Sequence, residues 1–184
     1  DCSDHEVNIK ILVGDVEQAG DMTRKQRDKL LEKMTDEVAD LVLRDNYLQS
    51  QAITVTHQIG AHLLDRLARY MRSMEKEDRL SRAIEFLPDD EVLLERQKRG
   101  EGLARPELAV LLSYAKIQLY DELLASDLPD DPYMESALVD YFPTPLRKSY
   151  RKEIARHRLR REIIATVVTN SIVNRLGKIG RAHV

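Results

Sequence analysis

The histidines and the single cysteine are the side chains of this sequence that could bind a metal ion or act as a nucleophile. His57 and His62 stand five residues apart, whereas zinc-binding helices space two histidines four apart so that both rings share one face. His5 begins a His-Glu pair, but Ile9 occupies the place where a zinc-protease pattern needs its second histidine. Cys2 has only His5 nearby as a base. We therefore expect no metal site and no catalytic residue in this chain.

A short glycine pattern, Gly100-Glu101-Gly102, could belong to a phosphate-binding loop. A dinucleotide fingerprint needs a third glycine three positions on, where this sequence has Arg105, and it needs a buried strand in front. The residues before Gly100 are charged and have a helical pattern instead. The sequence has no P-loop either. We therefore expect the chain by itself to bind no dinucleotide.

Positive charge is concentrated near the C-terminus. The net charge is -3, yet residues 145–184 carry 11 Lys and Arg against only Glu153 and Glu162. The basic run consists of Arg147, Lys148, Arg151, Lys152, Arg156, Arg158, Arg160 and Arg161. Such a run could contact phosphates, but Tyr150 is its only aromatic side chain that could stack on bases. We therefore expect it to pack against the acidic remainder of the chain and not to bind nucleic acid.

The composition is that of a soluble helical protein. Of the 184 residues, 42% are hydrophobic and 33% are charged, with few Gly and Pro and no Trp. No run approaches the ~20 apolar residues that a membrane-spanning helix needs. A single cysteine cannot form an internal disulfide, which favours a cytoplasmic location. The chain starts without Met or a secretory signal, and we expect it to be a piece of a longer protein.

Apolar residues recur at helical spacing through almost the whole chain. In the stretch Leu103 to Leu124 they form two faces, which predicts a helix buried between its neighbours. Pro106 and Glu107 are typical of the start of such a helix. We therefore predict an all-α fold, an irregular multi-helix bundle of about seven to nine helices around this central helix.

The other predicted helices are bounded by caps and breakers. Ser3 and Glu6 fit a capping box at the start of the first helix, which Gly14 or Gly20 should end. Thr35 is a predicted N-cap, and Asp45-Asn46 is a predicted break. The remaining predicted helices cover 23–34, 36–44, about 47–74, 80–86, 88–98, 133–141 and about 146–176, the last capped by Gly177.

Four long stretches of the sequence are distinctive. They are DCSDHEVNIKIL at 1–12, TDEVADLVLRDNYLQSQA at 35–52, RPELAVLLSYAKIQLYDELLASDLPDDPY at 105–133 and ARHRLRREIIATVVTNSIVNRLG at 155–177. These stretches resemble the large bacterial NAD-specific glutamate dehydrogenases. The resemblance runs in order through nearly the whole chain and is therefore more specific than any short motif. In that family the first stretch directly follows the dinucleotide-binding fold, and the others lie in a helical region near the end of the subunit.

This resemblance implies that the parent protein oxidises L-glutamate to 2-oxoglutarate and ammonia with NAD as the hydride acceptor, and that it forms a homo-oligomer. It also implies that the catalytic Lys and Asp and the NAD-binding glycines lie upstream of this chain, which would be structural or regulatory and inactive alone. Ser3 stands where smaller glutamate dehydrogenases have a serine that touches the side-chain carboxylate of glutamate. By resemblance Ser3 is thus the one substrate-binding residue here; the alternative is that it only caps its helix.

The resemblance also suggests how the chain is divided. Residues 1–20 would form a helix that packs on the upstream dinucleotide-binding domain through Val7, Ile11 and Leu12. Residues 21–177 would form the C-terminal helical domain, and residues 178–184 would be a tail foreign to the native protein, because KIGRAHV does not look like the family.

One internal position also departs from the family pattern, and one alternative interpretation stays open. The family usually has Thr where this sequence has Ala104, so a capping box with Glu107 is incomplete here. The alternative is a stand-alone helical interaction module that binds an acidic protein or RNA through the basic helix 146–176.

Overall fold

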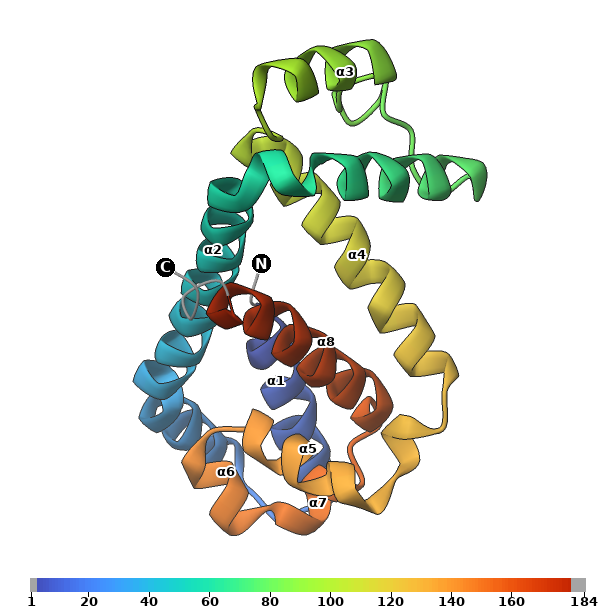
Figure 1. The fold of residues 1–184 in the computed structure, drawn as a ribbon. Helices are drawn as coiled ribbons and strands as arrows, with labels where there is room; N and C mark the ends of the chain where they lie inside the picture. Colours follow the sequence, from blue (N-terminus) through green and yellow to red (C-terminus); the bar gives the residue numbers. More distant parts are fainter. Residues whose placement is uncertain (1–2, 180–184) are drawn as a thin grey trace. The chain divides into compact units, whose positions relative to one another are not determined.

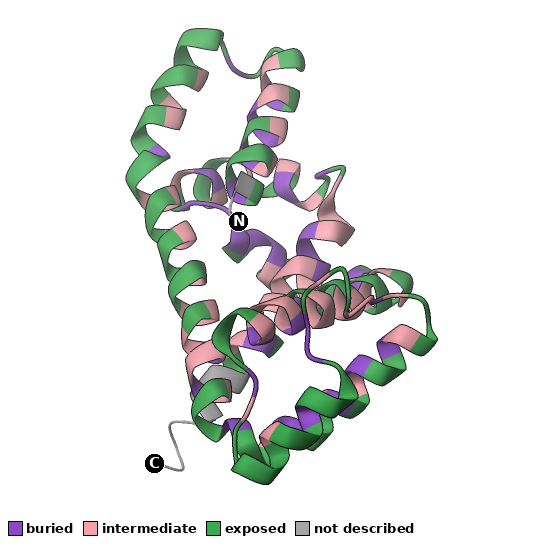
Figure 2. Cartoon of the chain, turned by 90° about the horizontal axis from the view of Figure 1, so that it is seen from above, coloured by how far each residue is buried: buried purple, intermediate pink, exposed green. Residues whose placement is uncertain are grey.

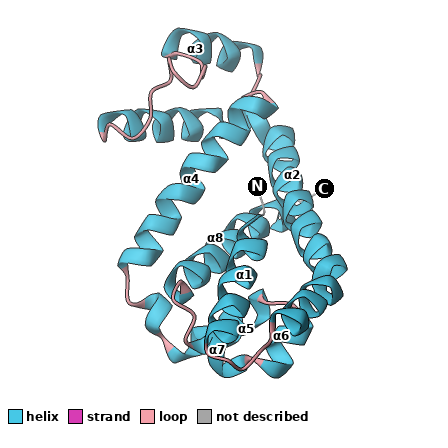
Figure 3. Cartoon of the chain, turned by 180° about the vertical axis from the view of Figure 1, so that it is seen from behind, coloured by secondary structure: helices cyan, strands magenta, loops and turns pink. Residues whose placement is uncertain are grey.

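A computed structural model describes residues 3–179, and their side chains from 4 to 175. These residues form helices joined by short turns and contain no strand (Figures 1 and 3), which confirms the all-α prediction. The α-helices are α1 (Ser3–Gln18), α2 (Arg24–Lys76), α3 (Asp90–Arg99), α4 (Arg105–Ala125), α5 (Glu135–Tyr141), α6 (Thr144–Ser149), α7 (Arg151–Ala155) and α8 (Arg160–Ile179). Two 3-10 helices, η1 (Leu128–Asp130) and η2 (Pro132–Met134), connect α4 to α5. Within this part of the chain, no helix combines the length and the hydrophobicity needed to span a membrane.

The helix α2 is continuous where the sequence predicted three separate helices. It runs through Thr35 and through Asp45-Asn46 without a break. The Thr35 hydroxyl donates to the Leu31 carbonyl at 3.2 Å, the bond that a threonine makes inside a helix and not at a cap. Leu31 and Val38, on either side of Thr35, pack against a buried core. Tertiary packing therefore overrides the weak local preference for a break.

The basic C-terminal stretch is also different from the prediction, because the single helix expected over 146–176 is divided into α6, α7 and α8. Tyr150 and Arg156 leave the helical conformation and end α6 and α7. The backbone N–H of Leu159 then donates to Nδ1 of His157 at 3.1 Å, a local bond that competes with helix continuation. Gly177 does not cap the last helix, since α8 continues to Ile179.

Residues 80–86 form a turn and not the predicted short helix. The Leu87 N–H donates to the Arg82 carbonyl at 2.9 Å, and Phe86 between them has a φ of 53°. This is the Schellman arrangement, which usually places a glycine at the left-handed position. Asp78 ends α2 in the same conformation, with a φ of 55°. The turn is therefore a helix-ending motif with an aromatic residue at the position that favours glycine.

The described chain divides into two compact units, each with its own core. The first unit takes in the chain up to Tyr47 together with Tyr120–Ser171. Its core joins α1, the first half of α2, and α5 to α8, through Ile9, Leu12, Val13, Met34, Leu138, Val139, Tyr141, Phe142, Leu146, Ile154, Ile163 and Ile164. Leu12 of α1 is thus packed inside this unit at 2% exposure, whereas Val7 is 50% exposed.

The second unit consists of Leu48–Leu119 and the chain from Ile172 onward. Its core contains Leu64, Ala68, Met71, Met74, Leu80, Leu87, Leu93, Leu103, Leu108 and Leu111. The prediction that α4 is a central buried helix was wrong, because only Leu108 and Leu111 of this helix are buried and Ile117 is 56% exposed. Figure 2 colours the chain by burial, and buried and exposed residues alternate along its helices. Two apolar faces indicate burial between two neighbours, but only the first turns of α4 are covered to that extent in this chain.

Candidate functional site

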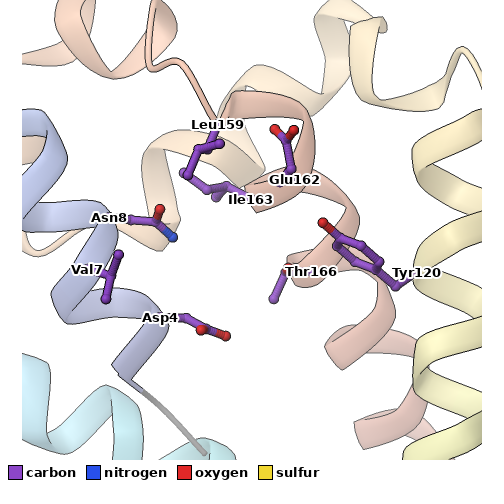
Figure 4. Close-up of a pocket in the computed structure, with 8 residues that line it drawn as sticks. All are labelled: Asp4, Val7, Asn8, Tyr120, Leu159, Glu162, Ile163 and Thr166. Carbon is purple, nitrogen blue, oxygen red and sulfur yellow. The ribbon is translucent and has the colours of Figure 1, made fainter.

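A pocket of about 390 Å³ lies against the first turns of α1, next to the position that the resemblance assigns to substrate. Side chains from α1, from the last part of α4 and from the start of α8 face it (Figure 4). They belong to the first compact unit. The lining residues are Asp4, Val7, Asn8, Tyr120, Leu159, Glu162, Ile163 and Thr166.

The pocket is acidic, because Asp4 and Glu162 supply carboxylates and none of the lining residues is Lys or Arg. Burial raises the pKa of Tyr120, and the negative charges of Glu162, Asp121 and Asp4 raise it further. A phenol with a raised pKa stays protonated at neutral pH, so it can donate a hydrogen bond but cannot act as a base. Such a pocket disfavours a dicarboxylate such as glutamate.

Asn8 of α1 is bonded to two other parts of the unit. Its side-chain Nδ2 donates to the hydroxyl of Tyr141 at 2.9 Å, and its backbone carbonyl lies 3.2 Å from Nε2 of His157. Because Nδ1 of His157 accepts the Leu159 N–H, the ring proton belongs on Nε2, which donates to the Asn8 carbonyl. Burial lowers the pKa of His157, which is 3% exposed, and so favours this neutral form.

His5 belongs to the same buried cluster as an aromatic ring. It stacks on Tyr141 with ring centroids 4.1 Å apart and an interplanar angle of 17°. Tyr141 meets Phe142 edge to face at 5.2 Å, and Phe142 lies 5.7 Å from the ring of His157. Nε2 of His5 is 3.9 Å from a carboxylate oxygen of Asp45. His5 thus packs α1 against α5 and α2, and the sequence had pointed to it only as a metal or thiol partner.

The other residues considered from the sequence lie apart from this cluster. His57 and His62 are exposed on α2, and no group of three or more His, Cys, Asp or Glu within the described residues could hold a metal ion. Gly100 ends α3 in the left-handed conformation, so the glycine pattern is a helix cap. Ser3 is the first residue of α1, but its side chain lies outside the described part, as does Cys2.

Five arginines of the basic run pair with acidic side chains of their own unit, in line with the packing that the sequence predicted. Arg147 pairs with Glu37 and Asp140, Arg151 with Glu135, Arg158 with Asp15, and both Arg160 and Arg161 with Asp130. Arg161 also donates to the backbone carbonyls of Leu124 and Ser126 at 2.9 and 3.1 Å. No continuous basic helix remains over 146–176, so nothing in this arrangement favours the interaction module.

Sequence reasoning missed the network of Asn8, Tyr141 and His157. His157 stands among arginines in the sequence, and its neighbours therefore suggested an exposed basic residue. Asn8 is a polar residue in a short amphipathic helix. The bond from the Leu159 N–H to His157 is local in the sequence, but it cannot be recognised without coordinates.

Comparison with known proteins shows which family of enzymes this chain is similar to. Residues 100–181 match the family model described as "Glutamate dehydrogenase, C-terminal", and residues 1–56 match "Bacterial NAD-glutamate dehydrogenase, catalytic domain". Among curated relatives, an NAD-specific glutamate dehydrogenase of Halomonas elongata is 47% identical over 178 residues, which are 97% of this chain. Proteins of the same name from Pseudomonas aeruginosa and Mycobacterium tuberculosis are 49% and 43% identical over 177 residues, 96% of the chain.

The chain spans 11% of the length of each of these relatives. The two family models lie in the order that the resemblance implied, with the catalytic-domain model over α1 and the first part of α2 and the C-terminal model from residue 100. The resemblance is thereby confirmed: over nearly its whole length, this chain is homologous to one segment of the NAD-specific glutamate dehydrogenases.

Proposed function

We propose that this chain is a helical segment of an enzyme that oxidises L-glutamate to 2-oxoglutarate and ammonia and passes the hydride to NAD. The observation that supports this most strongly is the identity of 43 to 49% over 96 to 97% of the chain with proteins of that name. In this proposal the catalytic Lys and Asp and the NAD-binding glycines belong to the upstream part of the enzyme. The segment described here has a structural role.

The role proposed for the first unit is to hold α1, which follows the catalytic region in the family. Four apolar residues of α1 are buried, namely Ile9, Leu12, Val13 and Val16. They fix the helix by burial, while Val7 remains exposed for a contact with the upstream dinucleotide-binding domain. The enzyme is proposed to work as a cytoplasmic homo-oligomer.

Ser3 is proposed to contact the substrate from the first turn of α1. A serine hydroxyl can donate a directional hydrogen bond to the side-chain carboxylate of glutamate without adding charge. Ser3 would orient the substrate and would carry no proton in the reaction.

The test is made in the full-length enzyme with Ser3→Ala. Loss of one neutral donor to a carboxylate costs about 1.5–3 kcal/mol, so kcat/KM for glutamate should fall roughly ten- to a hundredfold while hydride transfer persists. Ser113→Ala is the matched control, since Ser113 is exposed and donates only to the Ala109 carbonyl of its own helix at 3.0 Å. If Ser3→Ala lowers the melting temperature but leaves kcat/KM unchanged, Ser3 only caps its helix. If the unsubstituted full-length protein turns over no glutamate with NAD, the proposed function is wrong.

A further inference from the structure

Helix α1 is held by buried apolar contacts and by hydrogen bonds, and these two kinds of contact fix its position with different precision. Its buried apolar side chains supply most of the favourable free energy, but the hydrophobic effect has no direction. Hydrogen bonds do have a preferred distance and angle. Two directional contacts of α1, Glu17 with Arg27 and Asp15 with Arg158, lie in its last turns. The bonds to Asn8 are the ones nearer its start that can fix how far this end of α1 slides along its axis and how it rotates.

Asn8 is bonded through both its backbone and its side chain. The His157 ring donates to the Asn8 carbonyl at 3.2 Å, and the Asn8 amide donates to the Tyr141 hydroxyl at 2.9 Å. Two bonds to different elements at one residue restrain both translation and rotation of the helix. The His157 ring is itself held in place by the Leu159 N–H on its other nitrogen.

The residue that these bonds hold is close to the proposed substrate contact. Ser3 precedes Asn8 by five residues in the same helix, which is about 7.5 Å along the axis at 1.5 Å per residue. An α-helix transmits a shift along this distance with little loss. A displacement of Asn8 would therefore move the backbone of Ser3 by a similar amount, and misplacement by ~1 Å can cost up to ~100-fold in rate.

We propose that His157 is a positioning residue, which holds α1 through the Asn8 carbonyl and thereby sets the place of Ser3 relative to the side-chain carboxylate of glutamate. This inference rests on the proposed role of Ser3. It assigns to His157 an effect on substrate binding, although the ring is buried and touches no substrate.

Two substitutions of His157 separate this role from a general effect on folding. His157→Asn places an acceptor near the position of Nδ1, so it keeps the bond from Leu159 but cannot reach the Asn8 carbonyl. His157→Gln places an amide N–H near the position of Nε2 and keeps the bond to Asn8. In the full-length enzyme, the KM for glutamate should rise about three- to tenfold in His157→Asn and stay within about twofold in His157→Gln, with the KM for NAD unchanged in both.

A double-mutant cycle with Ser3→Ala then shows whether His157 acts through Ser3. In the Ser3→Ala background His157→Asn should no longer change the KM for glutamate, because the contact that it misplaces is absent. Leu93→Ala is the control for stability, since it lowers the stability of the other unit's core and should leave the KM for glutamate unchanged.

The outcomes separate the failure of this inference from the failure of the proposed function. If His157→Asn raises the KM equally with and without Ser3, or if the Asn and Gln variants behave alike, His157 is not a positioning residue, even though Ser3 binds substrate. If Ser3→Ala itself leaves the KM for glutamate unchanged, the role of Ser3 fails, and the positioning role of His157 fails with it.

Discussion

The backbones of Gly60 in α2 and Gly102, three residues before α4, are in direct contact. A methyl group on Gly102 would lie 2.6 Å from both Cα and the carbonyl carbon of Gly60. A methyl group on Gly60 would lie 3.3 Å from the Cα of Gly102. Neither glycine is required by a left-handed φ. Space, and not backbone conformation, requires glycine at position 102 and favours it at position 60: here two segments of the second unit meet without side chains between them.

Gly102→Ala should therefore destabilise the chain. Backbone atoms cannot give way as a flexible side chain can, and forcing extra atoms into a packed site typically costs about 1–3 kcal/mol. Gly60→Ala should cost less, because its closest contact is longer and alanine favours the helix by about 1 kcal/mol. Urea unfolding followed by circular dichroism measures both changes.

Gly14→Ala is the matched control for these two substitutions. Gly14 lies inside α1, and a methyl group there would meet nothing within 4 Å. The substitution should raise the free energy of unfolding by about 0.5–1 kcal/mol through the higher helix propensity of alanine. If Gly102→Ala proves as stable as Gly14→Ala, the two backbones are not in contact.

Ala104→Thr should stabilise the start of α4. Glu107 already accepts the backbone N–H of Ala104 at 2.7 Å and binds Arg96 through two bonds of 2.6 and 2.9 Å. One half of a capping box is thus present. A hydroxyl at position 104 would accept the N–H at Glu107, and a good N-cap contributes about 1 kcal/mol.

Ala104→Val is the control for this gain, since valine has nearly the shape of threonine but no hydroxyl. Thermal unfolding should show a higher midpoint for the Thr variant alone. Equal midpoints for the two variants would mean that side-chain volume, and not the cap, is what matters at this position.

Phe86→Gly should also raise stability. Phe86 has a φ of 53° and is 91% exposed, so its side chain contributes little burial while its backbone is held in an unfavourable region. The left-handed conformation costs a residue with a side chain about 1–2 kcal/mol, and glycine relieves it. Ile84→Gly is the comparison, because Ile84 is also exposed but has no positive φ. A loss of stability in both variants would refute this account of Phe86.

The sequence predicted the helix α3 well, because its ends depend on neighbouring residues. Asp89 accepts the Val92 N–H at the start of α3, and Gly100 caps its end, so local signals placed this helix within two residues. The continuity of α2 could not be predicted, because packing around Thr35 decides it. The site was harder still: His157 meets the Asn8 carbonyl across 149 residues of sequence, and no periodicity connects two such positions.

The stability of this chain should fall as the pH drops below about 6.5, in part because of His157. Burial lowers the pKa of this ring in the folded chain, while the unfolded chain keeps the ordinary value near 6.5. Below that pH the unfolded state binds a proton that the folded state does not bind, so the free energy of unfolding decreases. The loss continues until the pH reaches the lowered pKa of the folded state. Above pH 7 this ring contributes no pH dependence.

His157→Gln isolates this effect, since every other titrating group is common to both proteins. The free energy of unfolding, measured in urea from pH 7.5 to 5, should fall more steeply for the unsubstituted chain than for the variant. NMR titration should show that the ring takes up its proton at a lower pH in the folded chain than in the unfolded chain. The hydrogen bonds explain why: protonation puts a second N–H on the ring at Nδ1, opposite the Leu159 N–H that now donates to it. Parallel loss of stability in the two proteins would mean that the folded ring accepts a proton, and the bond from Leu159 to Nδ1 could then not be present.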